Sequence, residues 1–275
     1  MKDKMDLYKR KYIVYEIIKE STGRDFSALS KSGANMRALR VKCIFDFERV
    51  LQVMNWEKHK QNLYVGCARL KSIPNFTFNP KERSKETSEW FREEYNNLIV
   101  AYDLFLDFDK PPEDSWEDLI KEVKIFKEYL DDYKVPYYLL FSGNKGFQII
   151  IDGKYLPIKN IERGNIYPHK EIVEKIKTML NLKFLDLANN GVNSRLRKIP
   201  YSLVPNEIKD EQEMNIALPL DDIQFEYFRV ENMKVKNILS GTKLIRRGTL
   251  ERFQDIDLEE KKNNLQKFIS IFAFK

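Results

Sequence analysis

The chain has 275 residues, of which 43% are hydrophobic and 33% are charged. This composition is typical of a globular protein with one large domain or two closely packed modules. No apolar run approaches the roughly 20 residues of a membrane span, so we expect no membrane partner. The 48 basic and 42 acidic residues leave a net charge of +6, which is compatible with a polyanionic partner without identifying one.

Residues 1–6 are charged and lack the apolar segment of a secretory signal, which predicts a cytoplasmic location. The chain has two cysteines, Cys43 and Cys67, and two histidines, His59 and His169. Because these residues form neither a Cys-x-x-Cys pair nor a Cys/His cluster, we expect no structural zinc site. His169 begins an expected helix, and we expect its side chain at the surface.

The first third of the chain contains two predicted helices and one predicted strand. Apolar residues recur at helical spacing over residues 6–20 and 45–56, and residues 62–70 have the composition of a strand. The segments at 21–35 and 72–90 are expected to be loops. A further segment brings three basic side chains close together: Arg37, Arg40 and Lys42.

The central part of the chain predicts two strands joined by a helix. Residues 97–108 and 135–141 have the composition of strands, and Ser115 can cap an amphipathic helix between them. Strand, helix and strand at this spacing imply a parallel pair with a right-handed crossover. A tight turn at 142–146 leads to a third strand at 147–151, which we expect to lie antiparallel to the second.

The remainder of the chain is predicted to form a helix over residues 169–181 and a basic stretch between Asp186 and Pro200. The last 40 residues are expected to contain a strand or loop followed by a helix from Leu258 onward.

Asp107 and Asp109 form the most informative pair of residues. Successive residues of a strand point to opposite faces, so these two carboxylates share one face while Leu104, Leu106 and Phe108 point into a core. Like charges so close repel, so one carboxylate is protonated or both bind a cation. Mg²⁺ and Mn²⁺ favour oxygen ligands of this kind. The alternative is a strand end at which both acids face bulk water.

Two further segments have the chemistry of phosphate binding. In the turn from Ser142 to Gln148, glycines let backbone amides approach an anion and Lys145 adds a positive charge; the alternative is an ordinary hairpin. After Asp186, Arg195 and Arg197 alternate like one face of a strand, and guanidinium groups fork onto phosphate. The alternative there is a solvated basic edge strand.

Together these groups supply what nucleotidyl transfer requires. Carboxylates hold two metal ions that activate a 3′-hydroxyl and stabilise the leaving pyrophosphate, while cations and turn amides neutralise a triphosphate. No protein nucleophile is needed, which suits a chain with few histidines and cysteines.

The sequence resembles the archaeo-eukaryotic primase superfamily. This family includes the small catalytic subunits of primases, the primase-polymerases and the polymerase domains of bacterial end-joining ligases. The resemblance covers about residues 60–235. It rests mainly on three segments in order, which are Leu106 to Asp109, Ser142 to Gln148, and Leu185-Asp186 followed by Arg195 to Leu203. Flanking segments at 64–69 and 217–221 are also similar.

The resemblance implies an α/β fold in which a mixed sheet of the RNA-recognition-motif type packs on an N-terminal α/β module. It implies a catalytic domain over residues 1–235 and a C-terminal extension over 236–275. The implied function is template-directed synthesis or extension of primers on single-stranded DNA from nucleoside triphosphates. A large primase subunit or a helicase is a possible partner in that family.

Site residues follow from the same resemblance. It makes Asp107, Asp109 and Asp186 the ligands of two Mg²⁺ or Mn²⁺ ions. Contacts to the nucleotide phosphates are assigned to Ser142, Lys145 and one of Arg195 and Arg197. For Arg37 and Arg40 a contact to template or triphosphate rests on charge alone, and an ordinary surface position is an equal alternative.

Two departures from the family leave alternatives open. Gln148 stands where the family has histidine; glutamine can donate a hydrogen bond to phosphate but never carries a positive charge. The zinc-binding cysteines of archaeal small subunits are also missing. One alternative is therefore a catalytically weakened subunit that binds nucleic acid or a primase partner. Another is an unrelated metal-dependent nuclease built on the same acids.

Overall fold

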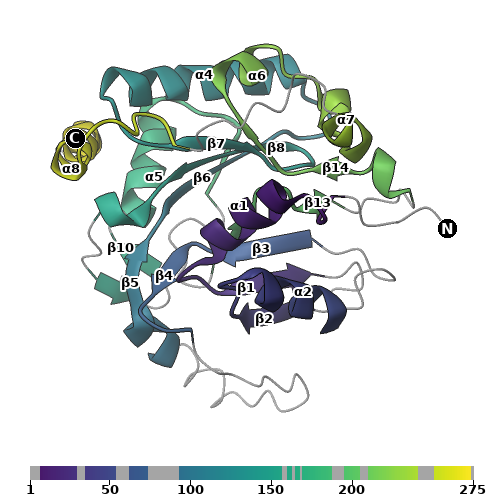
Figure 1. Ribbon diagram of the computed structural model, residues 1–275. Helices are drawn as coiled ribbons and strands as arrows, with labels where there is room; N and C mark the ends of the chain where they lie inside the picture. The colour runs from purple at the N-terminus through teal and green to yellow at the C-terminus, as the bar shows by residue number, and fades with distance from the viewer. Residues whose placement is uncertain are drawn as a thin grey trace.

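The computed structural model describes residues 7–29, 35–53, 62–73, 93–156, 160–162, 165–167, 169–187, 195–204, 210–240 and 251–273. The protein has the predicted α/β class: two sheets lie one above the other, helix α1 (Lys11–Ser21) lies between them, and further helices cover the outer face of the upper sheet (Figure 1). Within these ranges no helix is both long enough and apolar enough to cross a lipid bilayer.

The upper sheet has five strands in the order β11-β6-β8-β7-β15. Their bounds are Leu185–Asp186, Leu104–Asp109, Gly146–Ile151, Tyr138–Phe141 and Leu218–Leu220. Strands β6 and β7 run in the same direction, as predicted, but they are not hydrogen-bonded to each other. Strand β8 lies between them and pairs antiparallel with both, so every hydrogen-bonded pair in this sheet is antiparallel. The predicted antiparallel pairing of β7 and β8 is confirmed.

The lower sheet has four strands in the order β12-β3-β1-β2, all paired antiparallel. Their bounds are Leu196–Lys198, Asn62–Gly66, Phe26–Leu29 and Asn35–Leu39. Three two-stranded sheets complete the β-structure: β4 (Ala68–Leu70) with β5 (Ile99–Tyr102), β9 (Asn160–Glu162) with β10 (Asn165–Tyr167), and β13 (Leu203–Val204) with β14 (Asn215–Ile216).

Two strands predicted as continuous are each divided between sheets. The segment 62–70 breaks at Cys67 into β3 and β4, and the segment 97–108 breaks at Asp103 into β5 and β6. The breaks lie side by side, because the Asp103 N–H donates to the Cys67 carbonyl at 3.0 Å and the Cys67 N–H donates to the Arg195 carbonyl at 2.9 Å. The chain therefore links the two large sheets at this crossing.

The predicted helices are confirmed within a few residues, except for the earlier start expected of α1. They are α1, α2 (Ile44–Val53), α4 (Trp116–Asp132), α5 (His169–Met179) and α8 (Leu258–Ala273). Ser115 caps α4 as predicted, since its side chain accepts a hydrogen bond from the Asp118 N–H at 3.1 Å. Shorter helical segments are α6 (Asp222–Glu226), α7 (Val235–Leu239), η2 (Gly153–Tyr155), η3 (Glu211–Glu213) and η4 (Val230–Met233).

The buried face of α4 explains why β6 has two different sides. Leu119, Val123, Phe126 and Leu130 of α4 are fully buried and belong to the main hydrophobic core. Leu104, Leu106 and Phe108 of β6 belong to the same core, as the alternation of the sequence predicts. The opposite side of β6 therefore presents its other residues, including the aspartates, toward the lower sheet.

The predicted surface position of His169 is wrong. Its side chain is 1% exposed, its Nε2 lies 2.7 Å from the Tyr102 carbonyl oxygen, and its ring packs edge-on against the Tyr102 ring. Burial lowers the pKa of His169 to about 4, so the ring is neutral near pH 7. The cause is tertiary: β5 covers the first turn of α5, which helical periodicity does not reveal.

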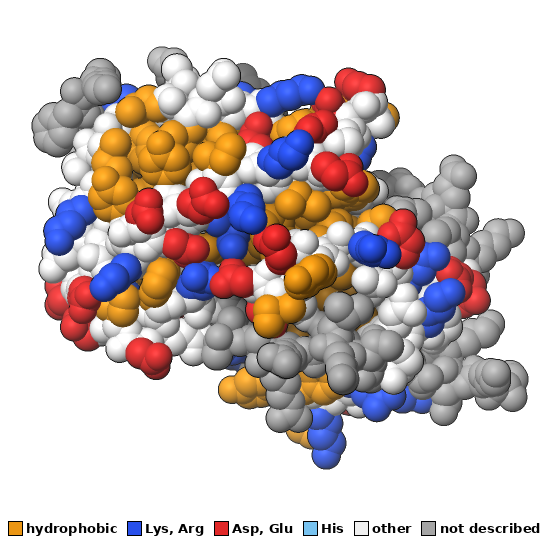
Figure 2. Space-filling model, turned by 90° about the horizontal axis from the view of Figure 1, so that it is seen from above, with side chains coloured by type: hydrophobic (Ala, Val, Ile, Leu, Met, Phe, Trp, Pro, Cys, Tyr) orange, Lys and Arg blue, Asp and Glu red, His pale blue; other side chains and the backbone are white. Residues whose placement is uncertain are grey.

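The helical face of the upper sheet carries charges of both signs. In Figure 2 basic and acidic side chains are interspersed on this face, and no extended area of one sign stands out. The net charge of +6 is therefore not gathered on this side of the molecule.

Candidate active site

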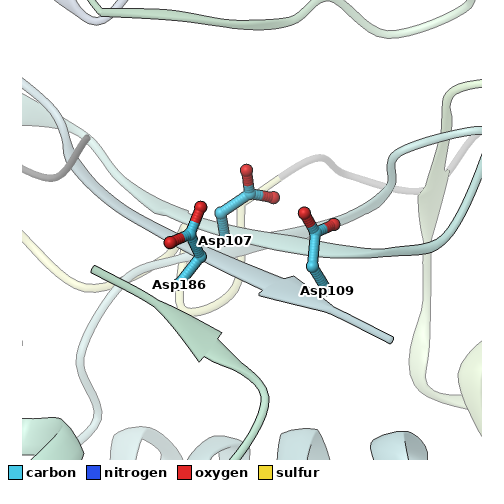
Figure 3. A group of neighbouring side chains, drawn as sticks. All are labelled: Asp107, Asp109 and Asp186. Atoms are coloured by element: carbon cyan, nitrogen blue, oxygen red, sulfur yellow. The ribbon is translucent and has the colours of Figure 1, made fainter. Parts of the chain in front are cut away.

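Three aspartates meet at the end of β6. Asp107 and Asp109 belong to β6, and Asp186 ends the neighbouring strand β11, where it pairs directly with Asp107. One carboxylate oxygen of each residue lies within 4.8 Å of the other two, and the three side chains project from the same side of the sheet (Figure 3). Three hard oxygen donors at this separation fit a divalent cation such as Mg²⁺ or Mn²⁺.

Glycines are required where the turn between β7 and β8 passes the aspartates. Gly146 pairs with Asp109, and a Cβ atom at Gly146 would lie 1.9 Å from the Phe108 carbonyl oxygen and 2.9 Å from Asp109 Oδ1. Gly143 has a φ of +84°, which favours glycine. The Ser142 N–H donates to the Gly146 carbonyl at 2.9 Å and closes the turn.

This tight turn holds Lys145 next to the aspartates. Lys145 Nζ lies 2.7 Å from Asp109 Oδ2, and the hydrogen bond to Asp109 is the main cause of the raised pKa of Lys145. The turn is therefore a hairpin, as one interpretation of the sequence had it, and it also delivers a cation to the site.

The surroundings of Asp107 do not balance its charge. Its side chain is buried, and burial followed by the charge of Asp109 raises the pKa of Asp107 to about 7, although Arg195 and Gln148 act in the opposite direction. Gln148 is the cross-strand partner of Asp107, and its Nε2 donates to Asp107 Oδ1 at 3.3 Å. The Gln148 Oε1 atom is buried and has no hydrogen-bond partner among the described residues. A cation bound to the carboxylates would supply the compensation that is missing here.

The two arginines of the basic stretch have different environments. Arg195 Nη2 lies 3.3 Å from Asp107 Oδ2, and its side chain is 25% exposed. The Arg197 side chain is 1% exposed, and its guanidinium group contacts Asp103 at 3.2 Å and Glu20 at 2.6 Å. The structure thus brings Arg195 to the aspartates and buries Arg197 behind it.

Sequence reasoning did not single out Lys198 and Tyr64, which pair across β12 and β3. Lys198 Nζ lies 4.4 Å from the centre of the Tyr64 ring and donates to Asn62. Burial lowers the pKa of Lys198 to about 7, and the charge of Asp107 opposes this shift. The sequence does place Lys198 directly after Arg197. However, the alternation of a strand groups Arg195 with Arg197 and puts Lys198 on the opposite face.

The structure does not bring Arg40 to this site. Arg40 is exposed and follows β2, which is the edge strand at the far side of the lower sheet from β12. The side chain of Arg37 lies outside the described residues.

Comparisons with known proteins show the fold. The structure aligns with the polymerase domain of Mycobacterium tuberculosis ligase D, solved in complex with DNA, over 89% of this chain and 91% of that chain, with a TM-score of 0.53 and 13% identity. Two structures of the primase RepB′ give TM-scores of 0.38 and 0.39 at 10% identity, each over 76% of this chain and over 55% and 83% of the RepB′ chains, which is too low to show a shared fold. The chain therefore has the fold of the ligase D polymerase domain.

Sequence comparison adds little to this. The uncharacterized protein MJECS07 of Methanocaldococcus jannaschii is 27% identical over 179 residues, and the match covers 58% of this chain and 38% of that protein. The chain thus spans well under half the length of this relative. No family model matches the sequence.

Proposed function

We propose that the protein is a template-directed nucleotidyltransferase that makes or extends short primers, in the manner of a primase or primase-polymerase. One observation carries the proposal: three carboxylates meet Lys145 and Arg195 on one face of β6. Lys145 lies in the turn before β8 of the upper sheet, and Arg195 immediately precedes β12 of the lower sheet. The polymerase-domain fold supports it.

In this proposal Asp107, Asp109 and Asp186 hold two Mg²⁺ or Mn²⁺ ions. The ions supply Lewis acidity toward a primer 3′-hydroxyl and the leaving pyrophosphate. The protein's own part is to bind and orient the triphosphate between cationic side chains and hydrogen-bond donors that are already in place around the carboxylates. These residues are Lys145, Arg195 and Lys198 together with Ser142 and Gln148. Arg197 is assigned a structural role, because its guanidinium group is already held by two acids.

Several expectations from the sequence remain proposals: a single-stranded DNA template, a large-subunit or helicase partner, a DNA contact at Arg37 and Arg40, a cytoplasmic location, and the division at residue 235. The rival of a catalytically weakened binding subunit is favoured by Gln148, which lacks the charge of a histidine. Against it stands the environment of Asp107, because an unused carboxylate with its pKa raised to about 7 destabilises the protein without benefit. The nuclease alternative leaves Lys145 and Arg195 without a triphosphate to bind. A thermal unfolding experiment in which a nucleoside triphosphate raises the Tm would contradict this alternative.

The test is incorporation of labelled nucleotides on a single-stranded DNA template, with and without a primer, in Mg²⁺ and in Mn²⁺. We expect metal-dependent product that falls about 100-fold or more in Asp107→Ala and is unchanged in Asp118→Ala, which removes an exposed acid of α4. The primer-free reaction separates a primase from an enzyme that only extends. Absence of product from folded wild-type protein that still binds DNA contradicts the proposal and supports the binding subunit.

A further inference from the structure

We infer that Lys145 and Arg195 are exchangeable counterions. Each pairs with an aspartate before metal binds and moves to the phosphates of the nucleotide when metal occupies that aspartate. This inference rests on the proposed function of the site and adds how its metal and its nucleotide are coupled.

Lys145 and Arg195 each form an ion pair with a carboxylate that a metal ion would also bind. Lys145 Nζ lies 2.7 Å from Asp109 Oδ2, and Arg195 Nη2 lies 3.3 Å from Asp107 Oδ2. They approach from different elements, since Lys145 belongs to the turn before β8 and Arg195 immediately precedes β12 of the lower sheet. A metal ion that enters the triad must therefore compete with two side-chain cations for the same oxygens.

The two ion pairs have the character of contacts that exchange easily. The Lys145 side chain is 58% exposed, and an ion pair so open to water contributes little to stability. Arg195 reaches Asp107 by a single long contact, and its buried Nε has no hydrogen-bond partner among the described residues. Its guanidinium group thus retains N–H groups that can donate hydrogen bonds to a phosphate oxygen. Arg197 differs in its burial, because its side chain is 1% exposed and is held between two acids.

Charge balance explains why metal and nucleotide should bind cooperatively. Before metal binds, the two cations offset part of the negative charge of the three carboxylates. When divalent ions take over the carboxylates, Lys145 and Arg195 lose their partners and the site becomes positive. A triphosphate restores the balance, so each ligand favours the binding of the other. Removal of Lys145 or Arg195 must then strengthen the binding of metal alone and weaken the binding of the nucleotide.

The experiment compares Lys145→Met with Lys121→Met by isothermal titration calorimetry. Lys121 lies on α4 on the other side of the sheet, with a 75% exposed side chain paired to Asp118, so it controls for the change in net charge. First, Mn²⁺ alone is titrated into each protein. Second, a non-hydrolysable nucleoside triphosphate is titrated at saturating Mn²⁺.

We expect Lys145→Met to bind Mn²⁺ alone about 3- to 5-fold more tightly than wild type and to bind the triphosphate about 10-fold more weakly. Arg195→Met should show the same pair of opposite changes, and Lys121→Met neither. If Lys145→Met and Arg195→Met bind Mn²⁺ no more tightly than wild type, the inference is wrong. This outcome differs from failure of the proposed function, which would appear as wild-type protein that binds no Mn²⁺ sensitive to Asp107→Ala, or that incorporates no nucleotide.

Discussion

Asp107 shows how the surroundings of a single residue support the proposed metal site. Its side chain is 8% exposed and is surrounded by Asp109 and Asp186, and Arg195 and Gln148 compensate only in part. A buried carboxylate with too few partners weakens the folded state, whereas Asp103, which immediately precedes β6, is satisfied by two arginines. This difference between the two buried aspartates supports the proposal that Asp107 is a metal ligand and Asp103 a structural residue.

The raised pKa of Asp107 gives a pH-dependent prediction. An aspartate in the unfolded chain ionises near pH 3.9, while Asp107 in the folded protein ionises near 7. As pH rises between these values the unfolded chain releases its proton first, so the metal-free protein loses stability, by up to about 4 kcal/mol. Asp107→Asn removes this loss, and we expect a higher Tm than wild type at pH 8 but not at pH 4.

Thermal unfolding in a chelator at both pH values checks this, with Asp118→Asn as the control for loss of an exposed acid. Added Mn²⁺ should raise the Tm of wild type at pH 8 and leave that of Asp107→Asn unchanged. A lower Tm of the variant at pH 8 would show that Asp107 stabilises the metal-free fold.

Among the elements, strand β12 connects the candidate active site to the buried ion-pair cluster between the two large sheets. Arg195, just before the strand, reaches Asp107, while Arg197 within it contacts Asp103 and Glu20. Arg24 shares Asp103 at 2.8 Å, so the cluster connects α1, β12 and the start of β6. Burial alone would raise the pKa of Asp103, but Arg24 and Arg197 outweigh it and hold the pKa below its ordinary value. The cluster therefore sets where β12, and with it Arg195, lies relative to β6.

Loss of Arg197 should be costly because it leaves buried acids with too few partners. We expect Arg197→Met to lower the free energy of unfolding by roughly 3 kcal/mol or more. Lys236→Met, which removes an exposed partner of Glu213, should cost less than about 1 kcal/mol. Urea unfolding of both variants measures the difference, and equal small effects would mean that the buried cluster does not hold the sheets together.

The whole molecule is held together by chain crossings and by a core that extends to the C-terminal helix. Leu265, Phe268 and Phe272 of α8 are buried in the same core as β6 and α4, and the Phe268 and Phe126 rings lie 6.2 Å apart. The expected boundary between residues 235 and 236 falls at the start of α7. These contacts indicate that α8 contributes to the same folded unit as β6 and α4.

A substitution in α8 tests this. Phe268→Ala should lower the free energy of unfolding by about 3–5 kcal/mol, because it opens a cavity in a shared core. Leu258→Ala, at an exposed position of the same helix, should cost less than about 1 kcal/mol. Chemical denaturation can be followed by the fluorescence of the three tryptophans, one of which, Trp116, lies on α4. If Phe268→Ala leaves that transition unchanged, α8 does not contribute to the folded unit that contains β6 and α4.

The sequence alone determined many local features of this protein, although the loop expected over residues 21–35 is wrong where the structure forms β1. The period-two pattern of β6 predicted that Asp107 and Asp109 share a face, helical periodicity located α1, α2, α4, α5 and α8, and Ser115 marked the start of α4. These predictions succeed because each depends on residues close together in the chain, whose spacing is set by the geometry of strand or helix.

Only the tertiary structure decided which segments cover those faces. It inserted β8 between β6 and β7, buried His169 under β5, separated the environments of Arg195 and Arg197, and brought Lys198 close to Asp107. Alternation shows that one side of an element is polar, but it does not show whether water, a metal ion or a buried acid meets that side. That partner comes from residues far away in the chain, and it is chosen by long-range strand pairing and by the need to neutralise each buried charge.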